Sequence, residues 1–65
     1  MPVGLAEFLR QKGIAAEQWW DALPPEAQTY HAEAFAALGP AAYAQRWAFH
    51  FSQWRRRYPL STSRT

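Results

Sequence analysis

The chain has no cysteine among its 65 residues. A disulfide framework and cysteine-ligated zinc or iron–sulfur centres are therefore excluded. β-Branched residues are also few, limited to Val3, Ile14, Thr29, Thr62 and Thr65. No stretch alternates apolar and polar residues as a half-buried strand does. The sequence therefore predicts an all-α protein.

Long apolar runs are absent as well. The longest stretch without a charged residue covers residues 34–45, and the Gly39-Pro40 pair interrupts it. A membrane-spanning helix needs about 20 consecutive apolar residues. The N-terminus also lacks the basic region and apolar run of a signal peptide. We expect a soluble, cytoplasmic protein that does not interact with a membrane.

Acidic residues are missing from the second half of the chain. Residues 1–33 hold all five acidic residues and two basic ones, a net charge of −3, whereas residues 34–65 hold five arginines and no acid, a net charge of +5. Such an asymmetry indicates an anionic partner, which is either another molecule or the acidic half of the chain itself.

Aromatic residues, by contrast, are abundant: the chain has four Trp, four Phe and three Tyr. A chain of this length forms one domain at most, and its core is marginal. Because each large aromatic side chain buries about 150–250 Å², a few of them supply much of such a core.

Glycine and proline divide the chain into four segments with helical periodicity. The pattern predicts helices over residues 3–12, 15–23, 25–38 and 40–58. Gly13 suits the left-handed position that ends the first helix, followed by Ile14 folding back on it. Pro25 suits the first position of the third helix, and Pro59 stops the fourth.

The Gly39-Pro40 joint predicts that the last two helices form an antiparallel hairpin. Residues whose numbers sum to about 79 then face each other, so that His31 meets residues 47–51. We expect a compact mini-domain of three to four helices over residues 1–58, followed by a frayed polar tail over residues 59–65. Its centre is expected to hold Phe35, Trp47, Phe51 and Trp54.

The basic residues of the second half suggest a nucleic-acid surface. Arginine pairs with phosphate and stacks on bases, and aromatic side chains offer stacking platforms. The candidate residues for this surface are Arg46, Arg55, Arg56, Arg57 and Arg64. An alternative reading is that basic residues favour the negative end of a helix dipole, and that Trp54 and Tyr58 belong to the core.

Two apolar positions stand out as candidate anchors for a protein partner. Phe49 falls on the polar face of its helix, near Gln45, Gln53 and Arg56. Aromatic and arginine residues dominate interface hot spots, although burial under another helix, or chance exposure, would also explain the position.

Trp19 and Trp20 point about 100° apart, so one is core and the other partly exposed. We expect Trp19 to be the exposed one.

His31 and His50 are predicted on facing sides of the hairpin. Zinc requires about four ligands, so two histidines without cysteine do not predict a metal site. We expect the two imidazoles to donate hydrogen bonds to a backbone carbonyl, to a tyrosine hydroxyl or to each other, with a pH-sensitive contact as an alternative.

Catalysis finds little support. The serines have no His–acid arrangement at suggestive spacing, the chain has no glycine-rich phosphate loop, and a domain this small leaves little room for a cleft. We expect a non-enzymatic protein without a cofactor.

The sequence leaves three hypotheses for the function. The first hypothesis is a small binding module or accessory subunit that docks on a larger protein or assembly. The second is a nucleic-acid-binding protein, and the third is a homo-oligomer whose acidic and basic halves pair.

Overall fold

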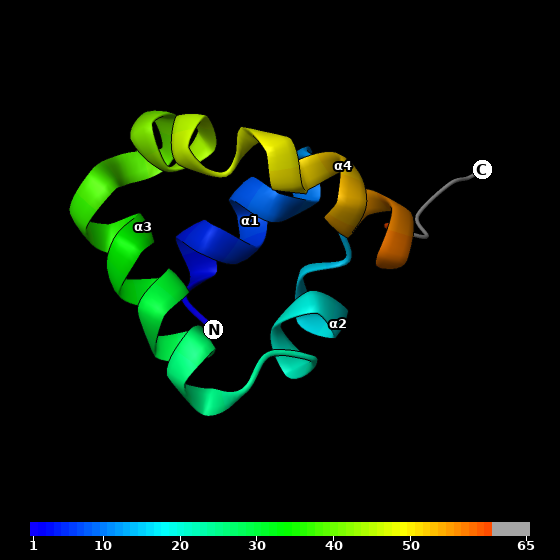
Figure 1. Ribbon diagram of the computed structural model, residues 1–65, viewed down its shortest axis with the longest axis horizontal. Helices are drawn as coiled ribbons and strands as arrows, with labels where there is room; N and C mark the ends of the chain where they lie inside the picture. The colour runs from blue at the N-terminus through cyan, green and yellow to red at the C-terminus, as the bar shows by residue number, and fades with distance from the viewer. Residues whose placement is uncertain (61–65) are drawn as a thin grey trace.

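The computed structural model describes residues 1–60, and it confirms an all-α fold (Figure 1). Four helices follow one another: α1 (Val3–Gln11), α2 (Ala16–Asp21), α3 (Pro25–Arg46) and α4 (Ala48–Arg57). Within residues 1–60 there is no strand, only an isolated bridge between Ile14 and Pro59. None of these helices is long and apolar enough to cross a bilayer.

The end of α1 follows the predicted glycine rule. Gly13 has a φ of 81°, the left-handed conformation that glycine adopts without strain. The Gly13 N–H donates to the Arg10 carbonyl at 2.9 Å, and the Ile14 N–H donates to the Leu9 carbonyl at 3.0 Å. This pair of bonds is a Schellman motif, and it leaves Ile14 fully buried.

The helix α3 consists of two limbs joined at Gly39. Pro25 occupies the first turn, as predicted, after an extended Pro24. Gly39 has a φ of 82° and a ψ of 166°, so the helix is interrupted there, and Pro40 opens the second limb. A backbone of this kind is essentially confined to glycine, which explains why the joint falls at this residue.

The predicted continuous helix over residues 40–58 is wrong, because the chain breaks at Trp47. This residue has a φ of −109° and a ψ of 16°, and the His50 N–H bonds to its carbonyl at 2.9 Å in a tighter turn. The Trp47 ring lies 4.7 Å from the ring of His31, whereas the Phe51 ring lies 5.8 Å from that of Phe8 on α1. Because of this bend, the ring of Trp47 packs against α3 and the ring of Phe51 packs against α1.

The two limbs of the expected hairpin open in a V (Figure 1). The first limb of α3 forms one side, while the second limb and α4 form the other; α1 lies between them and α2 closes the open end. Large rings bridge the limbs where they approach, as in the Phe35–Tyr43 pair at 5.4 Å.

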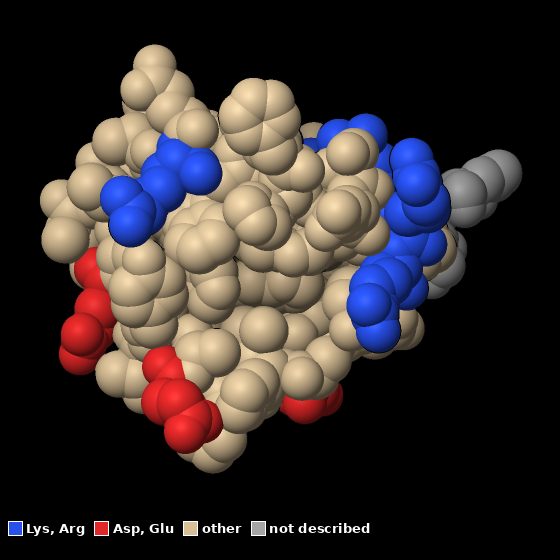
Figure 2. Space-filling view, in the orientation of Figure 1, with Lys and Arg blue, Asp and Glu red and all other residues tan. Residues whose placement is uncertain are grey.

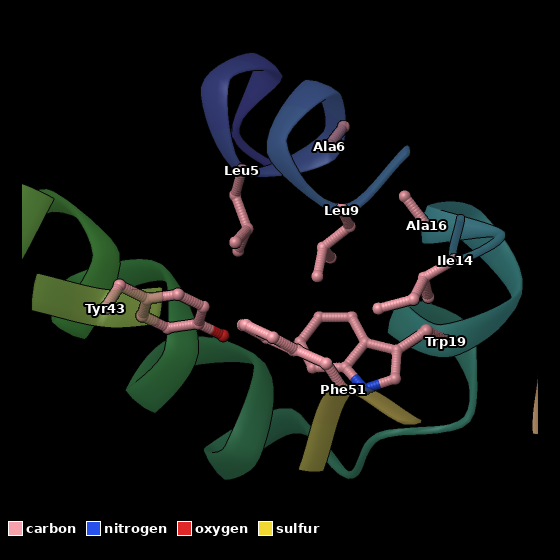
Figure 3. Close-up of a cluster of buried hydrophobic side chains, with 8 residues drawn as sticks. All are labelled: Leu5, Ala6, Leu9, Ile14, Ala16, Trp19, Tyr43 and Phe51. Atoms are coloured by element: carbon pink, nitrogen blue, oxygen red, sulfur yellow. The ribbon is translucent and has the colours of Figure 1, made fainter. Parts of the chain in front are cut away.

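The core lies where α1 meets this V (Figure 3). Leu5 and Leu9 point from α1 towards the rings of Tyr43, Phe51 and Trp19. The buried hydrophobic residues are Leu5, Ala6, Leu9, Ile14, Ala16, Trp19, Tyr43 and Phe51. Of the expected central residues only Phe51 is buried; the others, Phe35, Trp47 and Trp54, are half-buried and pack against this core.

The segment after α4 is tied to the turn between α1 and α2. The Ala15 N–H donates to the Tyr58 carbonyl at 2.7 Å, and the Leu60 N–H donates to the Gly13 carbonyl at 3.0 Å. The expected frayed tail is therefore wrong for Pro59, which lies in the bridge to Ile14, and for Leu60, which is hydrogen-bonded, while residues 61–65 lie outside the described part of the chain.

Candidate functional site

Phe49 is the most exposed large apolar residue described, with 92% of its surface accessible. It opens a face of α4 that continues with Gln53 and Arg56, four and seven residues later, and both of these are exposed. Gln45 is exposed too, but it precedes the break at Trp47 and so does not share the helical register of α4. The predicted anchor and two of its three neighbours therefore form one continuous face.

Trp19 is not available as an exposed anchor, contrary to the sequence-based expectation. Only 1% of its surface is accessible, and its ring packs 4.8 Å from that of Trp54 and 5.0 Å from that of His31. Trp20 is the half-buried member of the pair. The helix α2 lies across the open end of the V, and Trp19 is on the side of α2 that faces the core.

The predicted arginine cluster is divided among different roles. Arg55 donates from Nε to the Lys12 carbonyl at 2.9 Å and so caps the end of α1. Arg46 donates to the Tyr30 hydroxyl at 3.3 Å, on the exposed side of the limbs. Arg56 and Arg57 are exposed at the end of α4, and Arg64 lies outside the described residues. Only Arg56 and Arg57 remain together as a candidate anion-binding pair.

Two open hollows adjoin this arginine pair. The first, of about 270 Å³, lies between the end of α2 and α4 and is lined by Trp19, Ala22, Leu23, Gln53, Trp54, Arg57 and Tyr58. The second, of about 350 Å³, is lined by Gln53, Arg56 and Arg57. Among residues 1–60, no acidic residue lines either hollow.

The charge asymmetry of the sequence becomes a spatial one. Figure 2 shows basic side chains gathered mainly where α4 ends, and acidic side chains at the lower left and bottom of the same view. At this end of the molecule α4 contributes Arg55, Arg56 and Arg57 in its last turn. A positive potential around the hollows follows, because charges of one sign reinforce one another.

The buried histidine is hydrogen-bonded to a tyrosine of the second limb of α3. His31 is 7% exposed, and its Nδ1 lies 2.9 Å from the Tyr43 hydroxyl. Burial, with the charge of His50 as a smaller cause, lowers the pKa of His31 below its ordinary value of 6.5. Burial also raises the pKa of Tyr43. The part of the chain that the structure describes contains no cluster of residues fit to hold a metal ion.

The sequence identified Phe49, Gln53, Arg56 and Arg57, but not the wall that the turn after α2 contributes to the first hollow. Leu23 and Ala22 carry no chemical signal of their own, and only the docking of α2 against α4 brings them beside Arg57. Comparison with protein-family models, curated proteins and solved structures finds no match to this chain.

Proposed function

We propose that the protein is a small non-enzymatic binding module that docks on a larger protein through the exposed face of α4. The observation that carries this proposal is Phe49, whose side chain is almost fully accessible in a domain that buries or half-buries its other phenylalanines. Burying one such ring in a partner is worth about 1.5–3 kcal/mol.

The surroundings of Phe49 suit an interface. Gln53 and Arg56 follow it on the same face and offer hydrogen-bond donors to a rim, and α4 carries no acidic residue. Arginine and aromatic residues are enriched among the residues that dominate binding energy. The partner surface that fits is an apolar pocket with acidic or carbonyl groups at its edge.

The test compares partner capture by the wild-type chain and by Phe49→Ala, with Val3→Ala as the matched control. Val3 is another exposed apolar residue, 74% accessible on α1. A partner that the wild type and Val3→Ala retain, and that Phe49→Ala loses, is then titrated by calorimetry. We expect Phe49→Ala to weaken binding at least about tenfold, and an unchanged affinity would refute the proposal.

Nucleic-acid binding is a second candidate, supported by the exposed Arg56 and Arg57 beside hollows without acidic lining. Binding through phosphate contacts weakens steeply between about 50 and 200 mM salt. Replacing Arg57 with Gln should lower the slope of log affinity against log salt by about one. Binding without salt dependence would exclude this candidate.

Light scattering of the protein alone tests the hypothesis of a charge-paired homo-oligomer, which should dissociate when the salt concentration is raised.

A further inference from the structure

The first hollow combines an aromatic floor with polar groups at one edge. Trp54 of α4 and Tyr58, the residue that follows α4, are half-buried and line it on one side, and Leu23 lines it from the turn after α2. Trp19 lies beneath, packed against Trp54. Aromatic surfaces prefer offset stacking with other planar rings, so these lining residues favour a ligand that carries a flat aromatic group.

The second hollow offers two guanidinium groups to an anion. It shares Gln53 and Arg57 with the first hollow and adds Arg56. Two arginines match the charge and the several oxygen acceptors of a phosphate monoester better than those of a single carboxylate. The two hollows therefore adjoin at Gln53 and Arg57, with aromatic residues lining the first and two arginines lining the second.

The C-terminal end of α4 repels an anion in the second hollow less than a helix end with free carbonyl groups would. The C-terminal end of a helix carries a partial negative charge on unpaired carbonyl groups. The Tyr58 carbonyl, however, accepts a hydrogen bond from the Ala15 N–H at 2.7 Å. Arg55, in the same turn, donates to Lys12 instead of occupying the hollow. Arg56 and Arg57 are left to meet a ligand.

We propose that these joined hollows bind a nucleotide, with the base against Trp54, Tyr58 and Leu23 and the phosphate between Arg56 and Arg57. Gln53, which borders both hollows, presents an amide to the base edge or the sugar. The same chemistry is found in a free nucleoside monophosphate and at the phosphorylated end of a single strand. This site shares Gln53 and Arg56 with the face proposed for a protein partner, whereas Phe49 itself lines neither hollow.

The experiment is an NMR titration of the full-length, ¹⁵N-labelled chain with adenosine monophosphate. We expect saturable shifts at Leu23, Gln53 and Arg57, with a dissociation constant between about 10 µM and 1 mM for an open site of this size. Adenosine and inorganic phosphate, each carrying half of the ligand, should bind at least about tenfold more weakly. No saturable shift up to about 5 mM would overturn the proposal.

Matched variants distinguish binding of the nucleotide in the hollows from non-specific attraction between an anion and a basic protein. Arg57→Gln should weaken binding about tenfold, and Arg57→Lys should weaken it less, because lysine keeps the charge but loses the bidentate fork. Arg46→Gln removes the same charge from a residue that lines neither hollow, and it should leave the affinity unchanged. An equal loss in Arg46→Gln would overturn the proposal. The variant spectra report directly whether each chain is folded.

The two sources of ligand are distinguished by a short single strand with and without a 5′-phosphate. Tighter binding of the phosphorylated strand than of the free monophosphate identifies a strand end as the natural ligand, and equal binding identifies the free nucleotide. Phe49→Ala should bind the monophosphate as the wild type does, so loss of a protein partner and loss of the nucleotide are independent results. A dipeptide with a C-terminal aromatic residue that binds as tightly as the monophosphate would overturn the assignment to a nucleotide.

Discussion

Replacement of Arg55 by methionine tests whether this arginine stabilises the fold or serves a ligand. Methionine keeps an aliphatic chain beside Gly13, where a methyl group on the glycine would lie 3.3 Å from Cδ of Arg55. It removes the Nε donor that bonds to the Lys12 carbonyl at 2.9 Å. Arg56→Met is the matched control, because Arg56 is the next residue and is exposed on the ligand-facing side of α4.

The expected loss of stability follows from two contributions. A net hydrogen bond at an exposed position contributes about 1 kcal/mol. A cation at the end of a helix adds about 0.3–1 kcal/mol through the helix dipole, and Lys12 is the C-cap residue of α1. Arg55→Met should therefore destabilise the protein by about 1.5 kcal/mol, which lowers the melting temperature of a domain this small by about 6–12 °C.

The measurement is thermal unfolding followed by circular dichroism at low and high salt. Arg56→Met should change stability by less than about 0.5 kcal/mol, as surface substitutions usually do. Because the hydrogen bond survives screening while long-range charge effects do not, the difference between the two variants should persist at high salt. Equal melting temperatures for the two variants would refute the structural role of Arg55.

Three further predictions concern the core and the joint. Since the pKa of His31 is lowered in the folded state, the unfolded chain binds its proton more readily. Stability should therefore be full above about pH 6.5 and fall as the pH drops below it, a dependence measurable by urea unfolding and absent in His31→Phe. Trp19→Ala should cost about 3–5 kcal/mol and leave the chain largely unfolded by circular dichroism, and a native spectrum would contradict its burial. Gly39→Ala should cost about 1–3 kcal/mol through backbone strain, since the added methyl group meets no atom within 4 Å beyond its chain neighbours and the backbone of its own helix; an unchanged urea midpoint would contradict this.

The local structure of this chain follows rules that act within one helical turn. Gly13 and Ile14 close α1 through bonds to Arg10 and Leu9, three and five residues earlier, so the sequence pattern alone predicts the motif. Pro25 begins α3 for an equally local reason, because proline fixes its own φ and needs no donor in the first turn. The helical period places Phe49 with polar residues, although its exposure also requires that no other helix covers this face.

Contacts between distant segments required the tertiary structure. The sequence shows that Trp19 and Trp20 point in different directions, but only the docking of α2 against His31 and Trp54 determines which one is buried. Trp47 breaks a helix that its own periodicity favours, and its ring packs against His31 while the ring of Phe51, four residues later, packs against Phe8. Arg55 finds its acceptor 43 residues away. Periodicity thus determined the helices and their faces, whereas which helix covers each face, and which arginines remain exposed to a ligand, depended on packing between residues far apart in the chain.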